Sequence, residues 1–273
     1  MPVSPLAVVI STYNAPDFLR LTLEGYRQQS DKAFVIYIAD DGSTDETKIL
    51  IERLRRNFPV PVHHIWQPDD GFRKARIHNR VIARIDEPYT LLTDGDCIPL
   101  PELVAAHRRF ATDHIFISGS RVLLSATWTA TLCAQSAALT TDRPAIWWLQ
   151  QRFKGHINRV MPLLLPAALS PASTRLEGIR GCHLSCPTAA LRQINGFDES
   201  FEGWGREDSD LTARLLHAGL KRRNLRGQPV LHLWHREFSR QQLTENDALL
   251  QACLDEKRVE ALCGLKQLEE SHG

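Results

Sequence analysis

The sequence predicts an α/β protein with a mostly parallel, doubly wound sheet. Apolar runs and amphipathic segments with helical spacing alternate through the first hundred residues, and this β-α alternation is typical of parallel sheets. The runs are continuously apolar, as in strands that are covered on both faces. Polar segments follow three of these runs, at residues 11–14, 40–42 and 94–96. Because ligands bind beyond the carboxyl ends of parallel strands, we expect all three segments to open onto one crevice.

The first two strand–helix pairs lie near the N-terminus. Residues 6–10, LAVVI, form the first predicted strand. Asn14 is expected to cap the helix that follows, which carries Pro16 in its first turn. Residues 34–39 form the second strand, and the turn at residues 40–45 is expected to cap the second helix. The apolar sides expected of the two helices comprise Leu19, Leu23 and Tyr26 in the first and Ile49, Leu50 and Leu54 in the second.

Two further strands follow. Residues 62–66 form the third predicted strand, residues 73–85 a helix and residues 89–93 the fourth strand. At 273 residues the chain is long enough for one large domain or two fused halves. The tail at residues 240–270 is expected to form one or two amphipathic helices that pack on the body. The residues that predict these helices are Leu249, Leu250, Leu254, Leu262 and Leu265.

Composition and charge exclude several classes of protein. A net charge of +1 gives no bulk attraction to nucleic acid, so no nucleic-acid partner is expected. There is no run of eighteen apolar residues, and the run at residues 6–10 is too short for a signal peptide, so we expect a cytosolic protein. The cysteines are scattered and match neither a zinc motif nor a disulfide framework. They are expected to be reduced thiols: Cys97, Cys133, Cys182, Cys186, Cys253 and Cys263.

Two acidic clusters carry the candidate chemistry. Asp94 and Asp96 follow the fourth predicted strand, and Glu207 and Asp208 lie in a second cluster about a hundred residues later. Carboxylates can bind a divalent cation, and a spare carboxylate can act as a base. A diphosphate leaving group needs such a cation, and an attacking hydroxyl needs such a base.

Two histidines, His232 and His235, follow the second cluster. A carboxylate with an imidazole is a mixed ligand set that fits Mn²⁺ better than Mg²⁺, because Mg²⁺ strongly prefers oxygen ligands and water. If the segment is a strand, the odd offset places the two histidines on opposite faces, and only one can face the crevice.

The segments after the first two strands point to a nucleoside. The first strand is followed by STYNAP rather than a Gly-x-Gly-x-x-Gly motif, so a dinucleotide is not expected, and a Walker loop is absent too. The carboxylate of Asp41 suits a ribose hydroxyl or a base N–H, and Tyr13 offers a ring on which a base can stack. Turn formation is the alternative role for Asp41, because Asp-Gly-Ser-Thr also favours a turn.

Four motifs in this order resemble family 2 glycosyltransferases. The motifs are VVISTYN at residues 8–14, ADDGSTD at residues 39–45, TDGD at residues 93–96 and GFDESFEGWGREDSDL at residues 196–211. The last is similar to the C-terminal half of β-galactosyltransferases and bacterial chondroitin-type polymerases. The resemblance implies a type A glycosyltransferase fold and an enzyme that usually inverts the anomeric centre.

The resemblance also assigns roles to individual residues. The basic residue near the diphosphate aligns best with Lys74, with Arg73 and Arg76 as competitors. For the metal, Mn²⁺ or Mg²⁺, it implies Asp96 and favours His235 over His232. The residues it implies for the nucleotide-sugar are Thr12, Tyr13, Asp41, Lys74, Arg76 and Asp94.

The second acidic cluster is expected to do the chemistry. Asp208 is the expected general base, which takes the proton of the acceptor hydroxyl. Glu207 is expected to orient the acceptor, and Trp204 to stack on the apolar face of a sugar. First-turn acids that complement a helix dipole, and a tryptophan packed in the core, are the alternative interpretations.

The resemblance divides the chain into four parts. Residues 1–122 are expected to bind the nucleotide-sugar, residues 123–178 to form a helical insertion or lid, residues 179–238 to bind the acceptor and catalyse, and residues 239–273 to form a C-terminal helical tail. The insertion mixes aromatic and basic residues, such as Trp147 beside Trp148. This mixture suits a lid, an acceptor surface or a peripheral membrane contact, whereas a packed insertion is the alternative.

The resulting hypothesis is a metal-dependent, inverting glycosyltransferase with a nucleotide-sugar donor, most simply a UDP-sugar, and a glycan or glycolipid acceptor. Lipopolysaccharide or capsule synthesis at the inner membrane face is the setting that the family suggests. A nucleotidyltransferase is less compatible, because its glycine-rich N-terminal loop is missing. A catalytically inactive glycan-binding or scaffold protein of the same fold is the alternative.

Overall fold

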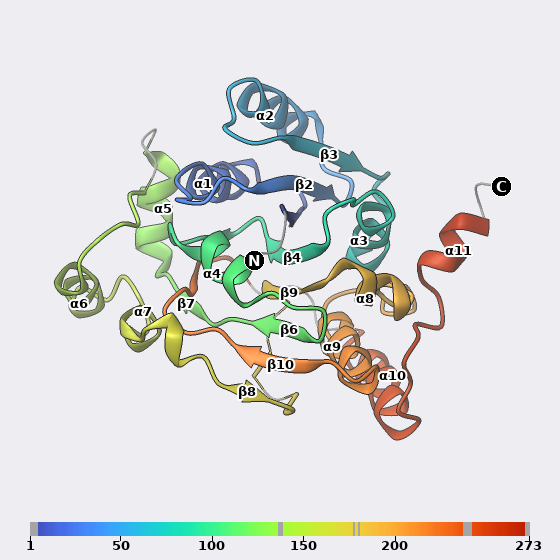
Figure 1. Cartoon of the computed structure of the whole chain (residues 1–273). Coiled ribbons are helices and arrows are strands. Elements are labelled where there is room, and N and C mark those ends of the chain that lie inside the picture. Colours follow the sequence, from blue (N-terminus) through green and yellow to red (C-terminus); the bar gives the residue numbers. More distant parts are fainter. Residues whose placement is uncertain (1–4, 136–138, 177, 180, 237–241, 271–273) are drawn as a thin grey trace.

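The computed structural model describes residues 5–135, 139–176, 178–179, 181–236 and 242–270. Its centre is an eight-stranded sheet of order β3-β2-β1-β4-β9-β6-β10-β8 (Figure 1). Strands β9 and β8 run antiparallel to their neighbours, and the other strands are parallel to one another. The strands are β1 (Leu6–Thr12), β2 (Phe34–Asp40), β3 (Val62–Trp66), β4 (Tyr89–Asp94), β6 (Ile115–Ser118), β8 (Ala172–Ser173), β9 (His183–Pro187) and β10 (Lys221–Asn224). The predicted α/β class with a mostly parallel sheet is confirmed.

A second, three-stranded sheet of order β5-β11-β7 lies beside the first. Its strands are β5 (Cys97–Ile98), β7 (Arg121–Leu123) and β11 (Val230–His232). Because β5 follows β4 almost directly in the chain, this small sheet brings the C-terminal histidines to the first acidic cluster.

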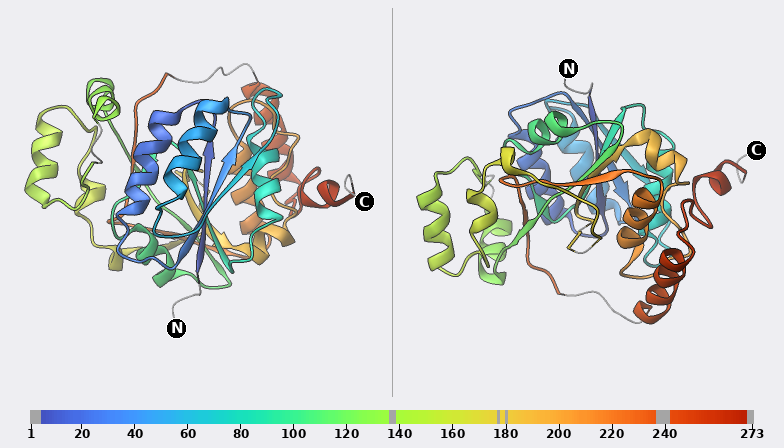
Figure 2. Two further views of the ribbon diagram at one scale, coloured as in Figure 1. Left: turned by 90° about the horizontal axis from the view of Figure 1, so that it is seen from above. Right: turned by 60° about the horizontal axis from the view of Figure 1, so that its bottom comes forward.

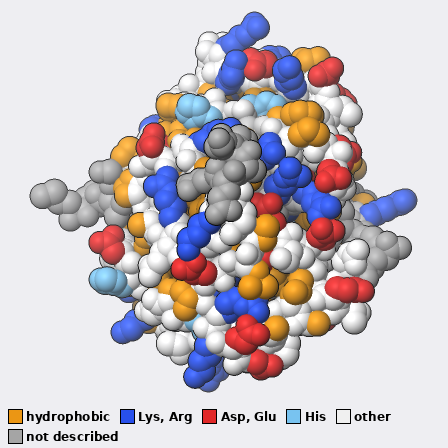
Figure 3. Space-filling model, turned by 90° about the vertical axis from the view of Figure 1, so that its right-hand side faces the viewer, with side chains coloured by type: hydrophobic (Ala, Val, Ile, Leu, Met, Phe, Trp, Pro, Cys, Tyr) orange, Lys and Arg blue, Asp and Glu red, His pale blue; other side chains and the backbone are white. Residues whose placement is uncertain are grey.

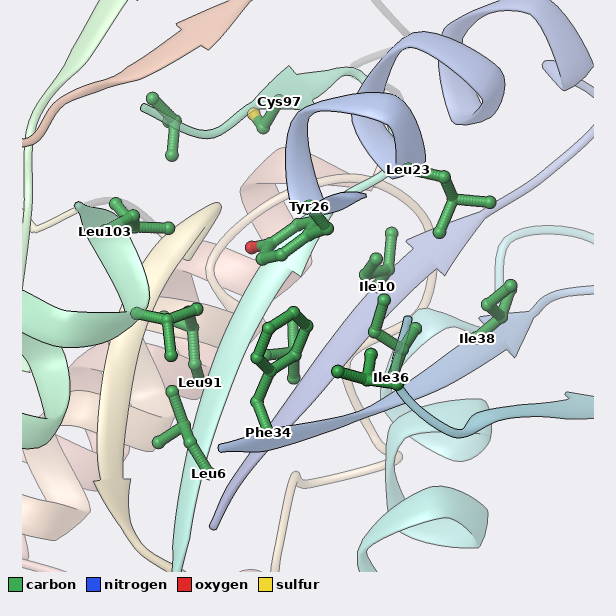
Figure 4. Close-up of a cluster of buried hydrophobic side chains, with 14 of the residues drawn as sticks. Leu6, Ile10, Leu23, Tyr26, Phe34, Ile36, Ile38, Leu91, Cys97 and Leu103 are labelled. Atoms are coloured by element: carbon green, nitrogen blue, oxygen red, sulfur yellow. The ribbon is translucent and has the colours of Figure 1, made fainter. Parts of the chain in front are cut away.

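Helices cover both faces of the main sheet. The core under α1 (Pro16–Arg27), α2 (Asp45–Arg55) and α4 (Leu103–Phe110) takes Leu6, Val8 and Ile10 from β1, and Figure 4 shows part of this cluster. Ala7 and Val9 point to the other face, under α3 (Lys74–Ile82), α8 (Thr188–Gln193) and α9 (Glu207–His217). A strand alternates its side chains between two faces, so this continuously apolar strand serves both cores.

The predicted helical insertion and tail are both present. The insertion contains α5 (Ala126–Ala134), α6 (Ala145–Phe153), α7 (Met161–Leu164) and a 3-10 turn at Ala167–Leu169, although its last strand, β8, joins the main sheet. The tail contains α10 (Leu243–Asp255) and α11 (Leu265–Glu270). Figure 2 shows the insertion helices at the opposite end of the molecule from α11.

Three expectations about the helices are wrong. Ala15, not Asn14, is the N-cap of α1. Asn14 has a positive φ of 45° and its side-chain oxygen accepts a hydrogen bond from the Thr44 N–H, so it joins the first polar loop to the second. Ile49 is 67% exposed and Leu262 is 58% exposed, because each lies on the solvent side of its segment.

A fully buried ion pair fixes the start of α9. Arg214 donates hydrogen bonds to the Asp210 carboxylate one turn earlier and to the carbonyl oxygens of Ile194 and Gly196. Arg214 and Asp210 are both completely buried. The pair therefore anchors the first turn of α9, which carries Glu207 and Asp208, to the body of the protein.

The surface is mixed in charge on the side that carries α3 and α11. Acidic and basic side chains are interleaved there, with small apolar areas between them (Figure 3). Among the described residues, no helix combines the length and the apolar character that crossing a bilayer would require.

Candidate functional site

The site lies at the carboxyl ends of β1, β2 and β4, as the sequence predicts for a parallel sheet. Ser11 and Asp94 are register partners at the ends of β1 and β4. The Ser11 hydroxyl donates a hydrogen bond of 2.7 Å to Oδ1 of Asp94. The strand pairing itself therefore holds the first carboxylate in place.

The loops after β1 and β2 form one end of the crevice. The N–H of Asp41 donates to the carbonyl of Thr12. The Asp41 carboxylate accepts hydrogen bonds from Nε2 of Gln67 (2.6 Å) and from the N–H of Arg73 (2.9 Å). Burial raises the pKa of Asp41, and these two hydrogen bonds oppose the rise. The Asp41 side chain thus has a structural role in the turn as well as the predicted binding role.

Tyr13 presents its ring to solvent beside this turn. The side chain is 46% exposed, and its hydroxyl donates a 2.9 Å hydrogen bond to Asp69. Gly42, with φ of 95°, lets the loop after β2 approach the loop after β3, because a Cβ there would lie 2.5 Å from the Cα of Asp69. The hydrogen bond fixes the ring while leaving it accessible for stacking.

Lys74 is the cation at the middle of the site. Its ammonium donates to Oδ1 of Asp94 at 2.8 Å and lies 3.8 Å from Oε1 of Glu207. Burial lowers the pKa of Lys74, but the two carboxylates outweigh burial and raise it above its ordinary value. Burial raises the pKa of the Asp94 carboxyl. The Lys74 ammonium and the Ser11 hydroxyl outweigh burial and hold this pKa well below its ordinary value.

The competing basic residues face elsewhere. The Arg73 side chain pairs with Glu202. Arg76 lies 3.8 Å from the exposed Asp70 and lines a separate cavity of about 380 Å³. The geometry therefore favours Lys74 as the residue that meets the acidic cluster.

Glu207 and Asp208 have different surroundings at the start of α9. Glu207 is 8% exposed, and its Oε2 has no hydrogen-bond partner among the residues that the structure describes. Burial first, and the neighbouring Asp208 second, raise the pKa of Glu207 to about 7, although Lys74 opposes the rise. The Asp208 Oδ2 instead accepts a 2.7 Å hydrogen bond from the N–H of Gly181. This contact ties the second acidic cluster to the loop before β9.

The tryptophan loop is held by the C-terminal tail. Trp204 is 38% exposed, so simple core packing does not describe it. The buried Asn246 of α10 donates hydrogen bonds to the carbonyl oxygens of Glu202 and Gly205 on either side of it. Sequence reasoning gave the tail no role in the site, because this contact joins positions more than forty residues apart.

Asp96 meets both histidines. Nε2 of His235 lies 3.1 Å from Oδ2 of Asp96, and Nε2 of His232 lies 3.7 Å from the same oxygen. Nδ1 of His232 donates to the carbonyl of Leu233, and Nδ1 of His235 donates to that of Arg236. The expectation that only one histidine can face the crevice is wrong, because β11 ends at His232 and strand alternation does not extend to His235.

This arrangement fits a divalent cation. The backbone hydrogen bonds at Nδ1 fix each tautomer and leave Nε2 as the ligand atom, as in metal-binding histidines. Ligand atoms on an octahedral ion with bonds of about 2.1 Å lie about 3 Å apart, and the 3.1 Å separation between Asp96 and His235 matches this spacing. One carboxylate and two imidazoles form a mixed oxygen and nitrogen donor set of the kind that binds divalent transition metals.

Two family models match the chain. The model for glycosyl transferase family 2 matches residues 7–131, and the model for the N-terminal domain of galactosyltransferase matches residues 167–236. Together they include both acidic clusters and both histidines.

A curated relative and two solved structures resemble the chain. Validoxylamine A glucosyltransferase from Streptomyces hygroscopicus is 26% identical over 79% of this chain and 52% of its own length. S. aureus TarS 1-349 in complex with UDP-GlcNAc has a TM-score of 0.62 at 13% identity, over 96% of this chain and 69% of that one. Mannosyltransferase PcManGT from Pyrobaculum calidifontis, in complex with GDP-Man and Mn²⁺, has a TM-score of 0.55 at 16% identity. This match covers 86% of the present chain and 59% of PcManGT. The chain spans about half the length of the first curated relatives that it matches.

Proposed function

We propose that this chain, whose residues 7–131 match the model for glycosyl transferase family 2, is a metal-dependent, inverting glycosyltransferase of that family. It would move a sugar from a nucleotide-diphospho-sugar to a hydroxyl of a glycan or glycolipid. The observation that carries the proposal is the meeting of Asp96 with His232 and His235 beside the Lys74–Asp94–Glu207 cluster, at the carboxyl ends of parallel strands.

The donor would lie across the first two loops. Asp41 would bind the nucleoside by hydrogen bonds, Tyr13 would stack on the base, and Thr12 lies between them. Asp94 would contact the ribose, and Lys74 would face the diphosphate. A UDP-sugar is the first donor class to test, because S. aureus TarS was solved with UDP-GlcNAc, whereas the GDP-Man bound by PcManGT makes GDP-sugars the comparison set.

Mn²⁺ is the proposed cation, held by Asp96, His232 and His235. Bound there, it would neutralise the charge that develops on a diphosphate leaving group. Asp96 and the two histidines would keep the ion at the edge of the crevice, whereas the Lys74 ammonium pairs with Asp94 and Glu207. The known PcManGT complex contains Mn²⁺, in line with this choice.

The second acidic cluster would act on the acceptor. Asp208 would take the proton of the attacking hydroxyl, and its hydrogen bond from Gly181 holds the carboxylate in one orientation. Glu207 would orient the acceptor by hydrogen bonds, since its Oε2, which has no partner in the described part of the chain, can accept one. Trp204 is sufficiently exposed to stack on a sugar ring.

A glycolipid acceptor would place the reaction at the inner membrane face in a cytoplasmic setting such as lipopolysaccharide or capsule synthesis. The insertion offers a surface for such a contact, and it includes the expected Phe153 but not the expected Trp148. Trp148 is only 4% exposed, whereas Phe153 is 89%, Ile146 61% and Met161 59% exposed. Exposed apolar side chains beside Arg152 and Lys154 suit an anionic bilayer surface.

A donor screen tests the proposed function. The intact chain is incubated with UDP-, GDP- and dTDP-sugars, with Mn²⁺ or with a chelator, and release of the nucleoside diphosphate is measured. Metal-dependent release from one donor class is expected, with faster release when a sugar acceptor is present. Tight nucleotide binding without release from any donor would instead favour an inactive binding or scaffold protein.

A further inference from the structure

The loop that carries Trp204 has a strained backbone. In this tryptophan loop, residues 202–206, the φ angles of Gly203, Gly205 and Arg206 are 70°, 108° and 78°. A positive φ is unfavourable for a residue with a side chain, so Arg206 keeps it only because its surroundings hold the loop. Helix α9, which carries the second acidic cluster, begins at the next residue. The conformation of the loop therefore sets where the Trp204 ring lies relative to that cluster.

Asn246 of α10 holds the tryptophan loop from one side. Its side chain is 2% exposed. The side-chain amide donates hydrogen bonds of 2.9 Å to the carbonyl oxygens of Glu202 and Gly205. An amide NH₂ group has two hydrogens, so both of its donors serve the loop. One buried side chain thus fixes the backbone before and after Trp204.

Helix α10 gives Asn246 a firm support. Cys253, near the end of α10, is completely buried. Nδ1 of His217, the last residue of α9, donates a 2.7 Å hydrogen bond to the carbonyl of Arg258, beyond the end of α10. The Asp247 carboxylate of α10 also pairs with Arg206 of the tryptophan loop. α10 is therefore fastened to α9 independently of Asn246.

The expected donor site holds the tryptophan loop from the other side. The N–H of Gly203 donates a 3.3 Å hydrogen bond to the carbonyl of Phe72, and the Glu202 carboxylate pairs with the Arg73 side chain. The Arg73 N–H donates to Asp41, the residue expected at the nucleoside. The loop therefore lies between the expected nucleoside site and α10.

We propose that Asn246 is a positioning residue for the acceptor, so that α10 belongs to the acceptor site. By holding the tryptophan loop, Asn246 keeps the exposed Trp204 ring where a sugar of the acceptor can stack beside Glu207 and Asp208. The inference rests on the proposed function, which assigns the acceptor to these residues. Both hydrogen bonds of the Asn246 amide go to the tryptophan loop, so their loss weakens acceptor binding and spares the donor.

A comparison of KM and kcat tests this role. Release of the nucleoside diphosphate is measured with Mn²⁺ and the donor class that the donor screen identifies. The acceptor probes are the methyl β-glycosides of glucose, galactose and N-acetylglucosamine. Asn246→Ala and Asn246→Asp should each raise the acceptor KM about tenfold, because two buried hydrogen bonds are lost, and leave kcat at saturating acceptor within about threefold.

Two controls accompany this comparison. Asn246→Asp keeps the volume of the side chain, but an ionised carboxylate cannot donate to a carbonyl oxygen. The same effect in both variants therefore excludes the cavity left by alanine as its cause. Gln251→Ala is the matched control on α10, since its exposed side chain bonds to Asp255 of the same helix, and it should leave both constants unchanged.

Hydrogen exchange of the tryptophan loop needs no turnover. Exchange of the peptide that covers residues 201–208 is followed by mass spectrometry in the intact, unaltered chain and in both Asn246 variants. It should be at least about tenfold faster in the variants, because the loop opens more often without its two hydrogen bonds. Exchange in β1 should be unchanged, which excludes a general loss of stability.

The outcomes separate the two proposals. Acceleration of release by a probe in the unaltered chain, together with an unchanged acceptor KM in both Asn246 variants, overturns the positioning role. A fall in kcat without a rise in KM also overturns it, because the effect would then lie in the chemical step. If no probe accelerates release by the unaltered chain, the proposed transfer to a sugar hydroxyl fails, while exchange of the loop still decides whether Asn246 holds Trp204.

Discussion

Replacing Glu207 with glutamine is expected to stabilise the protein at alkaline pH. Burial and Asp208 raise the pKa of Glu207 from 4.5 to about 7, so ionising this side chain is less favourable in the folded chain than in the unfolded chain. A group with a raised pKa contributes stability below its unfolded pKa and loses it as pH rises through its folded pKa. Each pKa unit is worth about 1.4 kcal/mol, so ionised Glu207 costs about 3 kcal/mol above pH 7.

Urea unfolding of the unaltered chain and Glu207→Gln at pH 5 and pH 8 measures this cost. Glutamine resembles the protonated acid, so its effect should be small at pH 5 and should stabilise by up to about 3 kcal/mol at pH 8. A change in packing would alter the free energy of unfolding equally at both pH values. The difference between the effects at pH 8 and pH 5 therefore reports the ionisation of Glu207 alone. Glu52→Gln, in an exposed ion pair on α2, is the control and should change stability by less than about 1 kcal/mol at either pH. An equal effect of Glu207→Gln at both pH values would show that folding does not raise the pKa of Glu207.

Three other substitutions test the proposed base, the buried ion pair and the proposed membrane contact. Asp208→Asn should leave donor affinity within a few-fold and lower kcat by roughly 10²–10⁴, and an unchanged kcat in steady-state assays would make Glu207 the next candidate base. Asp210→Asn leaves Arg214 buried without its carboxylate, so the free energy of unfolding measured in urea should fall by about 3–5 kcal/mol, and a loss below 1 kcal/mol would contradict the anchoring role. Phe153→Ser should reduce sedimentation with anionic liposomes, whereas sedimentation equal to that of the unaltered chain, or none with either protein, would remove the proposed membrane contact. Trp148→Phe is the buried control and should sediment normally.

The N-terminal half of the fold was predictable because its strands are covered on both faces. A continuously apolar run such as LAVVI in β1 indicates a strand that is buried between two layers of helices. Because β1, β2 and β4 are parallel, the polar segments that follow them lie at one edge of the sheet. The prediction that Leu19, Leu23 and Tyr26 face the core is confirmed.

The remaining strands were not predictable from their patterns. The sequence of β10 is KRRN, and β10 is a strand because it pairs with β6 and β8. In β9 the polar residues His183 and Ser185 are fully buried, since His107 bonds to both of them: its Nδ1 to the Ser185 hydroxyl and its Nε2 to His183. These hydrogen bonds join segments that are far apart in the sequence, so no local sequence pattern indicates that the polar residues are buried.

The candidate site likewise contains a part that was predictable from the sequence and a part that was not. The motifs identified Asp96 and the histidine pair, and the structure brings them together. The positions of Cys97 beside Cys182 and of Gly181 beside Asp208 depend on how β9 and α9 meet β4 and β5. These contacts are set by the packing of elements far apart in sequence, which no local motif encodes.

Calorimetric titration with UDP tests whether Asp96 and the two histidines hold a cation that binds the diphosphate. The unaltered chain should bind UDP much more tightly with Mn²⁺ than with a chelator, because the cation would connect Asp96 to the diphosphate. Asp96→Ala should remain folded by circular dichroism and lose this metal-dependent gain. Metal-dependent UDP binding of unchanged affinity in folded Asp96→Ala would contradict the assignment of Asp96 and the two histidines as the cation site.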